Sequence, residues 1–188
     1  VASTAGLARR RFVRQPETAM STPLLSLYHR LQRWPAGTWL FSRAVCFKAP
    51  YFASIAPRIT RLENGRCEGT LADRRKVRNH IGTVHAIAMC NLAELTAGLM
   101  VDASLPKGMR WIPKGMQVQY LAKARGTLQA TALPAQPIVV ATEGYALPVT
   151  VSVRDRAGTR LTRTAKPRSD ARRMSPFVDG APGISRET

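Results

Sequence analysis

Acidic residues and cysteines are scarce in this sequence of 188 residues. It has 11 Asp and Glu against 29 Lys and Arg, which gives a formal net charge of +18. A chain this basic attracts anions, so we expect a partner that carries negative charge, such as a nucleic acid, an anionic membrane or a phosphorylated small molecule. The three cysteines include no CxxC pair, which excludes a disulfide framework and a zinc site and favours a reducing, cytoplasmic setting.

Aromatic residues are also few, at 6%, whereas hydrophobic residues make up 45% of the chain. That share is ordinary for a globular protein, and the length corresponds to about one domain. We expect a basic, disordered N-terminal extension over residues 1–22, a domain over 23–166 and a flexible tail over 167–188. Two interpretations of residues 1–19 stay open: a basic arm, or a stretch that precedes a true start at Met20.

The spacing of apolar residues predicts most secondary structure. A helix is predicted over 23–34, capped by Ser21 or Thr22, and residues 38–56 are expected to form a short helix and a loop. Strands are predicted over 58–62 and 66–72, joined by a tight Asn-Gly turn. Further strands are predicted over 117–124, 127–133, 138–142, 149–155 and 159–165.

Between these strands lies a long, nearly uncharged segment over residues 84–101, which we interpret as a helix. The order predicts an α+β fold in which an antiparallel sheet covers one long central helix. Because the helix is apolar nearly all round, we expect it to be enclosed. His85, Asn91 and Glu94 argue against a transmembrane span.

Glu94 is the most informative residue of this helix. A carboxylate buried among apolar side chains has a raised pKa and can act as a general base. The alternative is that Glu94 lies on a solvated or subunit-facing stripe and pairs with an arginine. His85, near the helix start, is a cap, a hydrogen-bonding residue of the core or a catalytic group, and Cys90 is expected to be a core residue.

A recognisable motif surrounds this helix. Asn79, Gly82, His85 and Glu94 fall at the offsets of a pattern in the hot-dog-fold acyl-CoA thioesterases, and residues 118–126 resemble a strand of the same family. The sequence is most similar to the phenylacetate-pathway type and to a related, uncharacterised bacterial family. The resemblance covers about residues 50–165.

The resemblance implies an antiparallel sheet wrapped around one long central helix, in a homodimer or a dimer of dimers with active sites at the subunit interface. The implied substrate is an acyl-CoA thioester; coenzyme A is part of that substrate, and no other cofactor or metal is implied. Glu94 would be the general base or nucleophile, and Asn79 would orient water or the thioester. The amide of Ala86 or Ile87 would polarise the carbonyl, and His85 would shape the turn.

Four further residues are candidates for binding the substrate: Gly82, Arg78, Asn91 and Arg125. One departure from the family concerns the two glycines after its histidine, which are Ala86 and Ile87 here. Their extra bulk narrows access to the amide, so a protein that binds acyl-CoA without hydrolysing it stays open.

The remaining alternative is a basic protein that binds nucleic acid or an anionic membrane. No nucleic-acid motif is present, and Tyr120 and Tyr145 are the only aromatic residues between positions 117 and 165. This composition argues against nucleic acid.

Overall fold

The structure, a computed structural model, describes residues 22–140 and 144–164. The predicted tail and all but the last residue of the predicted N-terminal extension lie outside these ranges. The helical elements are α1 (Pro23–Leu31), α2 (Gly37–Lys48), η1 (Pro50–Ser54), η2 (Arg75–Val77) and α3 (Ala86–Ser104). The strands are β1 (Arg58–Glu63), β2 (Arg66–Leu71), β3 (Val118–Tyr120), β4 (Leu128–Pro134), β5 (Val149–Arg154) and β6 (Arg160–Thr164).

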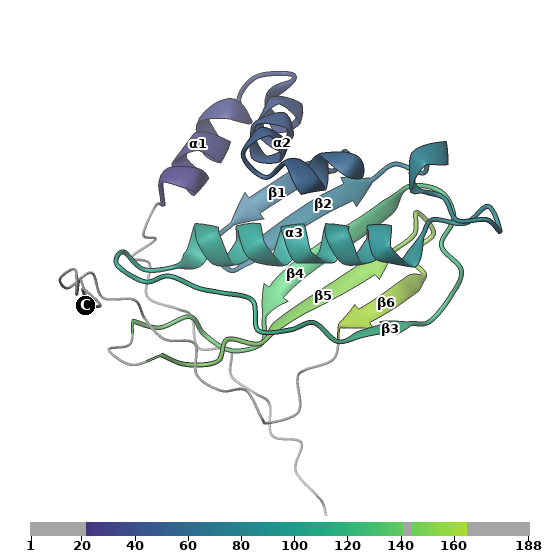
Figure 1. Cartoon of the computed structure of the whole chain (residues 1–188). Helices are drawn as coiled ribbons and strands as arrows, with labels where there is room; N and C mark the ends of the chain where they lie inside the picture. Colours follow the sequence, from purple (N-terminus) through teal and green to yellow (C-terminus); the bar gives the residue numbers. More distant parts are fainter. Residues whose placement is uncertain (1–21, 141–143, 165–188) are drawn as a thin grey trace, which may run out of the picture.

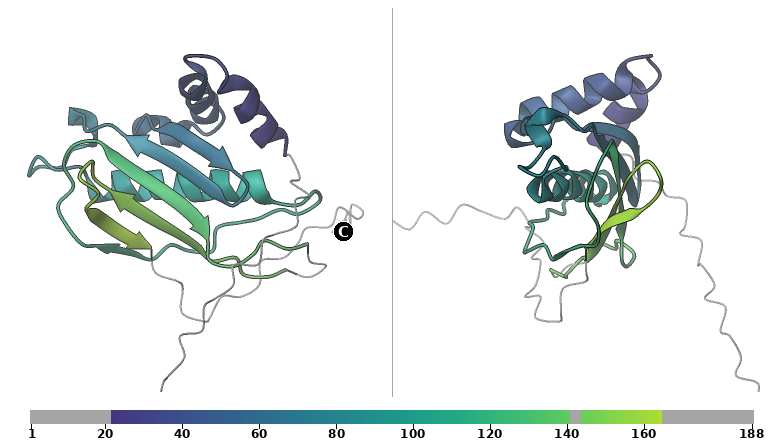
Figure 2. Two further views of the ribbon diagram at one scale, coloured as in Figure 1. Left: turned by 180° about the vertical axis from the view of Figure 1, so that it is seen from behind. Right: turned by 90° about the vertical axis from the view of Figure 1, so that its right-hand side faces the viewer.

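The six strands form one antiparallel sheet in the order β1-β2-β4-β5-β6-β3. The long helix α3 crosses one face of this curved sheet (Figures 1 and 2). The α+β hot-dog architecture predicted from the sequence is therefore confirmed. The sheet supplies the apolar surface on which the buried side of α3 packs, and the largest enclosed side chains there come from both layers: Leu62, Leu71, Leu92, Met100, Leu128 and Leu161.

Two predicted strands differ from the structure. The strand expected over 117–124 ends at Tyr120, because the Ala124 carbonyl accepts the N–H of Val84 instead of pairing within the sheet. The described part of the strand expected over 138–142 is not a strand. There the Tyr145 hydroxyl contacts both the N–H and the carbonyl of Val139, at 3.2 Å each, and takes the place of a strand neighbour.

The helices α1 and α2 pack at the β1 edge of the sheet (Figure 1). Thr22 caps α1 as predicted, accepting the N–H of Leu25 at 3.2 Å, but the helix ends at Leu31. Gly37 lies so close to the Leu31 carbonyl oxygen that a Cβ atom there would be 1.6 Å from it. The sharp α1–α2 junction therefore requires glycine. The Ser42 hydroxyl accepts the N–H of Ile59 at 2.8 Å, which satisfies an amide of the edge strand β1.

The helix α3 is not enclosed all round, which corrects one expectation from the sequence. Its buried side contacts β2, β4 and β5, but Ile87 and Glu94 are exposed, and Cys90 and Ala97 are half-buried. We call these four residues the open face of α3. Within the described ranges, α3 is the one helix long and apolar enough to span a bilayer, and most of it is buried against the rest of the fold.

Candidate active site

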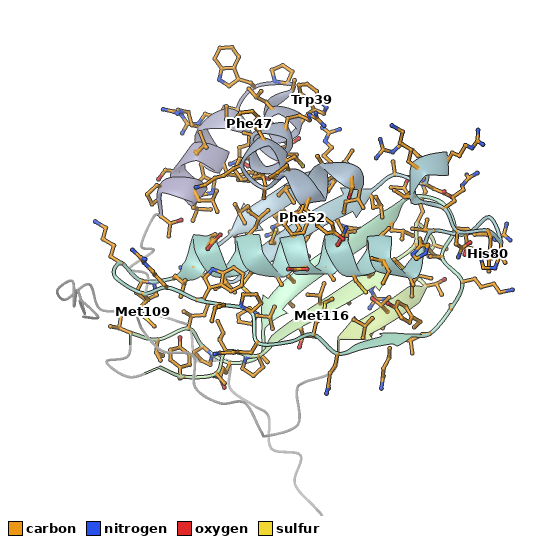
Figure 3. The ribbon with its side chains drawn as sticks, in the orientation of Figure 1. Trp39, Phe47, Phe52, His80, Met109 and Met116 are labelled. Atoms are coloured by element: carbon orange, nitrogen blue, oxygen red, sulfur yellow. The ribbon has the colours of Figure 1, made fainter. Side chains whose placement is uncertain are left out.

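The N-terminus of α3 is fixed by backbone hydrogen bonds to two distant segments. The N–H of His85 donates to the carbonyl of Val77 at 2.7 Å, and the N–H of Val84 donates to that of Ala124 at 2.9 Å. The loop before α3 therefore lies between η2 and the chain that leads into β4. Figure 3 shows His80 at the tip of this loop, beyond the end of α3.

Asn79 builds the loop with its own side chain. Its Oδ1 accepts the N–H groups of Ile81 (3.2 Å) and Thr83 (3.0 Å), and its Nδ2 donates to the Thr83 hydroxyl at 2.8 Å. Gly82 occupies the left-handed region with φ of 75°, which a residue with a Cβ rarely adopts, and so lets the loop close. Asn79 is thus engaged in the turn and retains one amide hydrogen for an outside partner.

His85 caps α3. Its Nδ1 accepts the N–H of Ile87 at 3.1 Å, so this nitrogen carries no proton and the ring places its donor on Nε2. The bond occupies the Ile87 amide, which corrects the prediction that this amide is available to a substrate. Within the described ranges, the neighbouring N–H of Ala86 has no acceptor. Of the two predicted amides, that of Ala86 is the free donor at the positive end of the helix.

Glu94 lies on the open face, two turns further along α3. The expectation that it is buried in the apolar helix is wrong for the protomer, since its side chain is exposed. The arginine partner considered as an alternative is also missing among the described side chains: none within residues 22–140 and 144–162 forms a hydrogen bond or an ion pair with Glu94. Asn91, expected on the same stripe, is buried instead at 8% exposure.

Cys90, and not Asn91, lies on the open face beside Glu94. Cys90 is expected from the sequence to be a core residue, and its half-buried side chain corrects that interpretation. Its Sγ lies 2.9 Å from the hydroxyl of Tyr120 on β3. This hydrogen bond, with desolvation, raises the pKa of Tyr120 to about 12. Tyr120 belongs to the segment that resembles the thioesterase family, but nothing in the sequence linked it to α3, because thirty residues separate it from Cys90.

The chain after α3 borders the open face. Trp111 packs over Gly98, where a Cβ atom would lie 3.2 Å from the indole, and its Nε1 donates to Asp102 at 2.6 Å. In Figure 3, Phe52 of η1 and Met116 lie on opposite sides of α3. Large apolar side chains on α3 and on the chain segments before and after it are exposed in the protomer: Ile81, Ile87, Ile112, Met116, Tyr120 and Leu121. Glu94 thus lies between Cys90 and Ala97 on a face of α3 that the described chain leaves exposed.

The predicted substrate-binding arginines differ in availability. Arg78 donates to Asp73 at 2.7 Å, and Asp73 also accepts the N–H of Gly126 at 2.9 Å. These bonds hold the pKa of Asp73 below its ordinary value, and they tie the loop before α3 to the turn before β4. Arg125 lies beside this pair, but its side chain forms no hydrogen bond or ion pair in the described part of the chain.

Comparison with known proteins agrees with this architecture. A thioesterase from Haemophilus influenzae is 15% identical, with a TM-score of 0.53 over 61% of this chain and 78% of that chain. A thioesterase family protein from Silicibacter pomeroyi is 18% identical, with a TM-score of 0.54 over 65% and 88%. At these identities the likeness establishes the fold, and the protein is of the hot-dog class.

The family is shown by a longer match. The sequence profile described as "Domain of unknown function (DUF4442)" matches residues 37–166, and the chain belongs to this family. A structural-genomics protein of known crystal structure is 47% identical, with a TM-score of 0.65 over 75% of this chain and 92% of that chain. No curated protein matches the sequence.

Proposed function

We propose that this protein hydrolyses an acyl-CoA thioester, with Glu94 as the general base. One observation carries the proposal. Of the acidic side chains in the described ranges, Glu94 alone has no hydrogen-bond or ion-pair partner among the described residues. Glu63, Glu68, Asp73, Asp102 and Asp155 are all engaged. A carboxylate that is exposed and unpaired is available to take a proton.

The reaction follows from these groups. Glu94 takes a proton from water as the oxygen attacks the thioester carbon. The resulting oxyanion accepts a hydrogen bond from the Ala86 N–H, at the end of α3 where the helix dipole favours negative charge. When the C–S bond breaks, the coenzyme A thiolate receives the proton held by Glu94. The products are a carboxylic acid and free coenzyme A.

The spacing of Ala86 and Glu94 indicates how the site is assembled. Eight residues of one helix correspond to about 12 Å along its axis, which is too far for both groups to act on one carbonyl. Two copies of α3 that pack antiparallel through their open faces would bring Glu94 of one protomer beside the partner subunit's Ala86. The exposed apolar side chains on α3 and on the chain segments before and after it support such a dimer.

A related protein offers a further parallel. A Staphylococcus aureus protein has two solved structures, one of which names it a thioesterase. A glutamine is substituted in one structure, and a glutamate 15 positions later is substituted in the other. Asn79 and Glu94 have the same separation. Asn79 would then act mainly as a positioning residue, because its amide is engaged in the loop.

The phosphates of coenzyme A would be bound near the start of α3. Arg75 and Lys76 on η2, together with Arg125, have exposed side chains that form no hydrogen bond or ion pair in the described part of the chain. They belong to the two segments that hold residues 84 and 85. Arg78 is less suited to this role because Asp73 already engages it.

The first test is Glu94→Gln, assayed by thiol release from short, medium, long and aromatic acyl-CoAs. Loss of a general base lowers the rate by about 10²–10⁴-fold. Thermal unfolding should stay unchanged because Glu94 is exposed and forms no hydrogen bond or ion pair with the described residues. Glu63→Gln, on the β1–β2 hairpin, is the matched control and should keep full activity. If the wild type releases thiol and Glu94→Gln releases it at the same rate, the proposal is refuted. If the wild type releases no thiol from any acyl-CoA of the panel, the result favours a protein that only binds acyl-CoA.

The second test removes the oxyanion donor without breaking the helix. Ala86 is the first residue of α3, where proline is tolerated, and His85 already has the extended backbone that precedes proline (φ −65°, ψ 138°). Ala86→Pro should fold and lose about 10²–10³-fold in rate.

Mixing the two inactive variants tests whether the site is shared between protomers. A dimer of one Glu94→Gln and one Ala86→Pro subunit contains one intact site if each site uses both protomers. An equal mixture, dissociated and reassociated, should recover about a quarter of the wild-type rate. Failure to recover activity, although mixed dimers form, would show that each site belongs to one protomer.

A further inference from the structure

The helix α2 is apolar on both of its faces. Phe41 and Cys46 are buried against the fold, whereas Trp39, Leu40 and Phe47 on the opposite face are 54%, 49% and 91% exposed. The outward face of a surface helix ordinarily carries charged and polar residues, so large exposed apolar side chains there are unusual. The outer face of α2 is therefore a surface that the described chain leaves without a partner.

Two more exposed aromatic residues flank α2 in the sequence. Trp34 precedes α2 and Tyr51 follows it, and they are 71% and 66% exposed. We call Trp34, Trp39, Leu40, Phe47 and Tyr51 the aromatic patch. Figure 3 shows Trp39 and Phe47 on the α1–α2 pair, away from α3.

The Lys and Arg residues of α1, α2 and the turn between them have no acidic neighbours within that stretch of sequence. Exposed cations lie on α1, on α2 and in the turn between them: Arg30, Arg33, Arg43 and Lys48. No acidic residue occurs between positions 22 and 62. Arg43 lies four residues from both Trp39 and Phe47, so it shares their face of α2. The surface that covers the patch must therefore tolerate large apolar groups and attract positive charge.

We propose that the aromatic patch docks on the surface of an anionic phospholipid membrane. Trp, Tyr and Phe favour the interface between headgroups and acyl chains, and Arg and Lys reach from an inserted helix face to lipid phosphates. A two-fold dimer through the patch is disfavoured, because it would bring the same cations of two protomers together without an acidic residue. The inference does not rest on the proposed function, since binding to a membrane requires no turnover.

The test is sedimentation of the full chain with vesicles of phosphatidylcholine, with and without phosphatidylglycerol. The wild type should bind the anionic vesicles and not the neutral ones. Trp39→Ser/Phe47→Ser should weaken this binding at least tenfold. Arg43→Gln/Lys48→Gln should weaken it about fivefold for each charge removed. In the wild type, brominated lipids should quench the tryptophan emission, which gives a readout that needs no variant.

Controls come from exposed residues at a distance from the patch. Leu133→Ser/Val140→Ser removes two exposed apolar side chains, and Arg156→Gln/Arg160→Gln removes two exposed charges. Both should bind vesicles like the wild type. Binding of the patch variants to anionic vesicles with the affinity of the wild type would overturn the proposal. It would also be overturned if the patch variants bound vesicles normally but dissociated an oligomer, or lost affinity only for single-stranded oligonucleotides.

Discussion

The separation of α3 from the sheet depends on Gly69 of β2. A Cβ atom at this position would lie 3.0 Å from Cγ2 of Thr96 and 3.3 Å from Cδ1 of Ile59. Thr96 and Ile59 are both 0% exposed, so neither can move into solvent. Overpacking of this kind costs about 1–3 kcal/mol, and a strand gains about 0.5–1 kcal/mol when alanine replaces glycine. We expect Gly69→Ala to lower the free energy of unfolding by about 1–2 kcal/mol, measured by urea denaturation.

A second substitution identifies the cause. Thr96→Ser removes Cγ2 but keeps the hydroxyl that donates to the Leu92 carbonyl at 2.9 Å. If the clash with Cγ2 dominates, the loss of unfolding free energy in Gly69→Ala/Thr96→Ser should be smaller, by about 1 kcal/mol, than the sum of the losses in the two single variants. Strict additivity would refute this account of the contact. Because Thr96 lies on the same turn of α3 as Glu94, the rescue should also restore any thioesterase activity that Gly69→Ala loses.

Two further predictions concern titrating groups. The pKa of Asp73 is held below its ordinary value of 3.8, so the stability that its bonds with Arg78 contribute is present above pH 3.8 and lost as the pH falls through the folded-state pKa. The difference in unfolding free energy between wild type and Asp73→Asn should therefore shrink in acid, and a constant difference would contradict this. The pKa of Tyr120, at about 12, depends chiefly on Cys90. Cys90→Ala should lower the phenol midpoint in an ultraviolet titration, with Tyr120→Phe identifying the transition; an unchanged midpoint would show that desolvation alone sets it.

Local patterns were enough to predict most of the fold. The Asn64-Gly65 turn, the cap at Thr22 and the apolar runs of the strands act over a few residues, so each was readable from the sequence. The boundary at Tyr120 was not, because the Ala124 carbonyl is engaged by Val84, forty residues earlier in the chain. For the candidate site, the spacing of Asn79, His85 and Glu94 was visible, whereas the engagement of the Ile87 amide by His85 was not.

The sequence by itself determined a basic chain with an antiparallel sheet and one long apolar helix that carries Glu94. Only the tertiary structure decided which side of that helix stays open. Apolar residues occupy all sides of α3, so their spacing cannot distinguish an enclosed face from an exposed one. Packing on β2, β4 and β5 buries Asn91 and leaves Cys90 and Glu94 outside. The direction in which a helix docks depends on contacts between distant segments, and those contacts exist only in the folded chain.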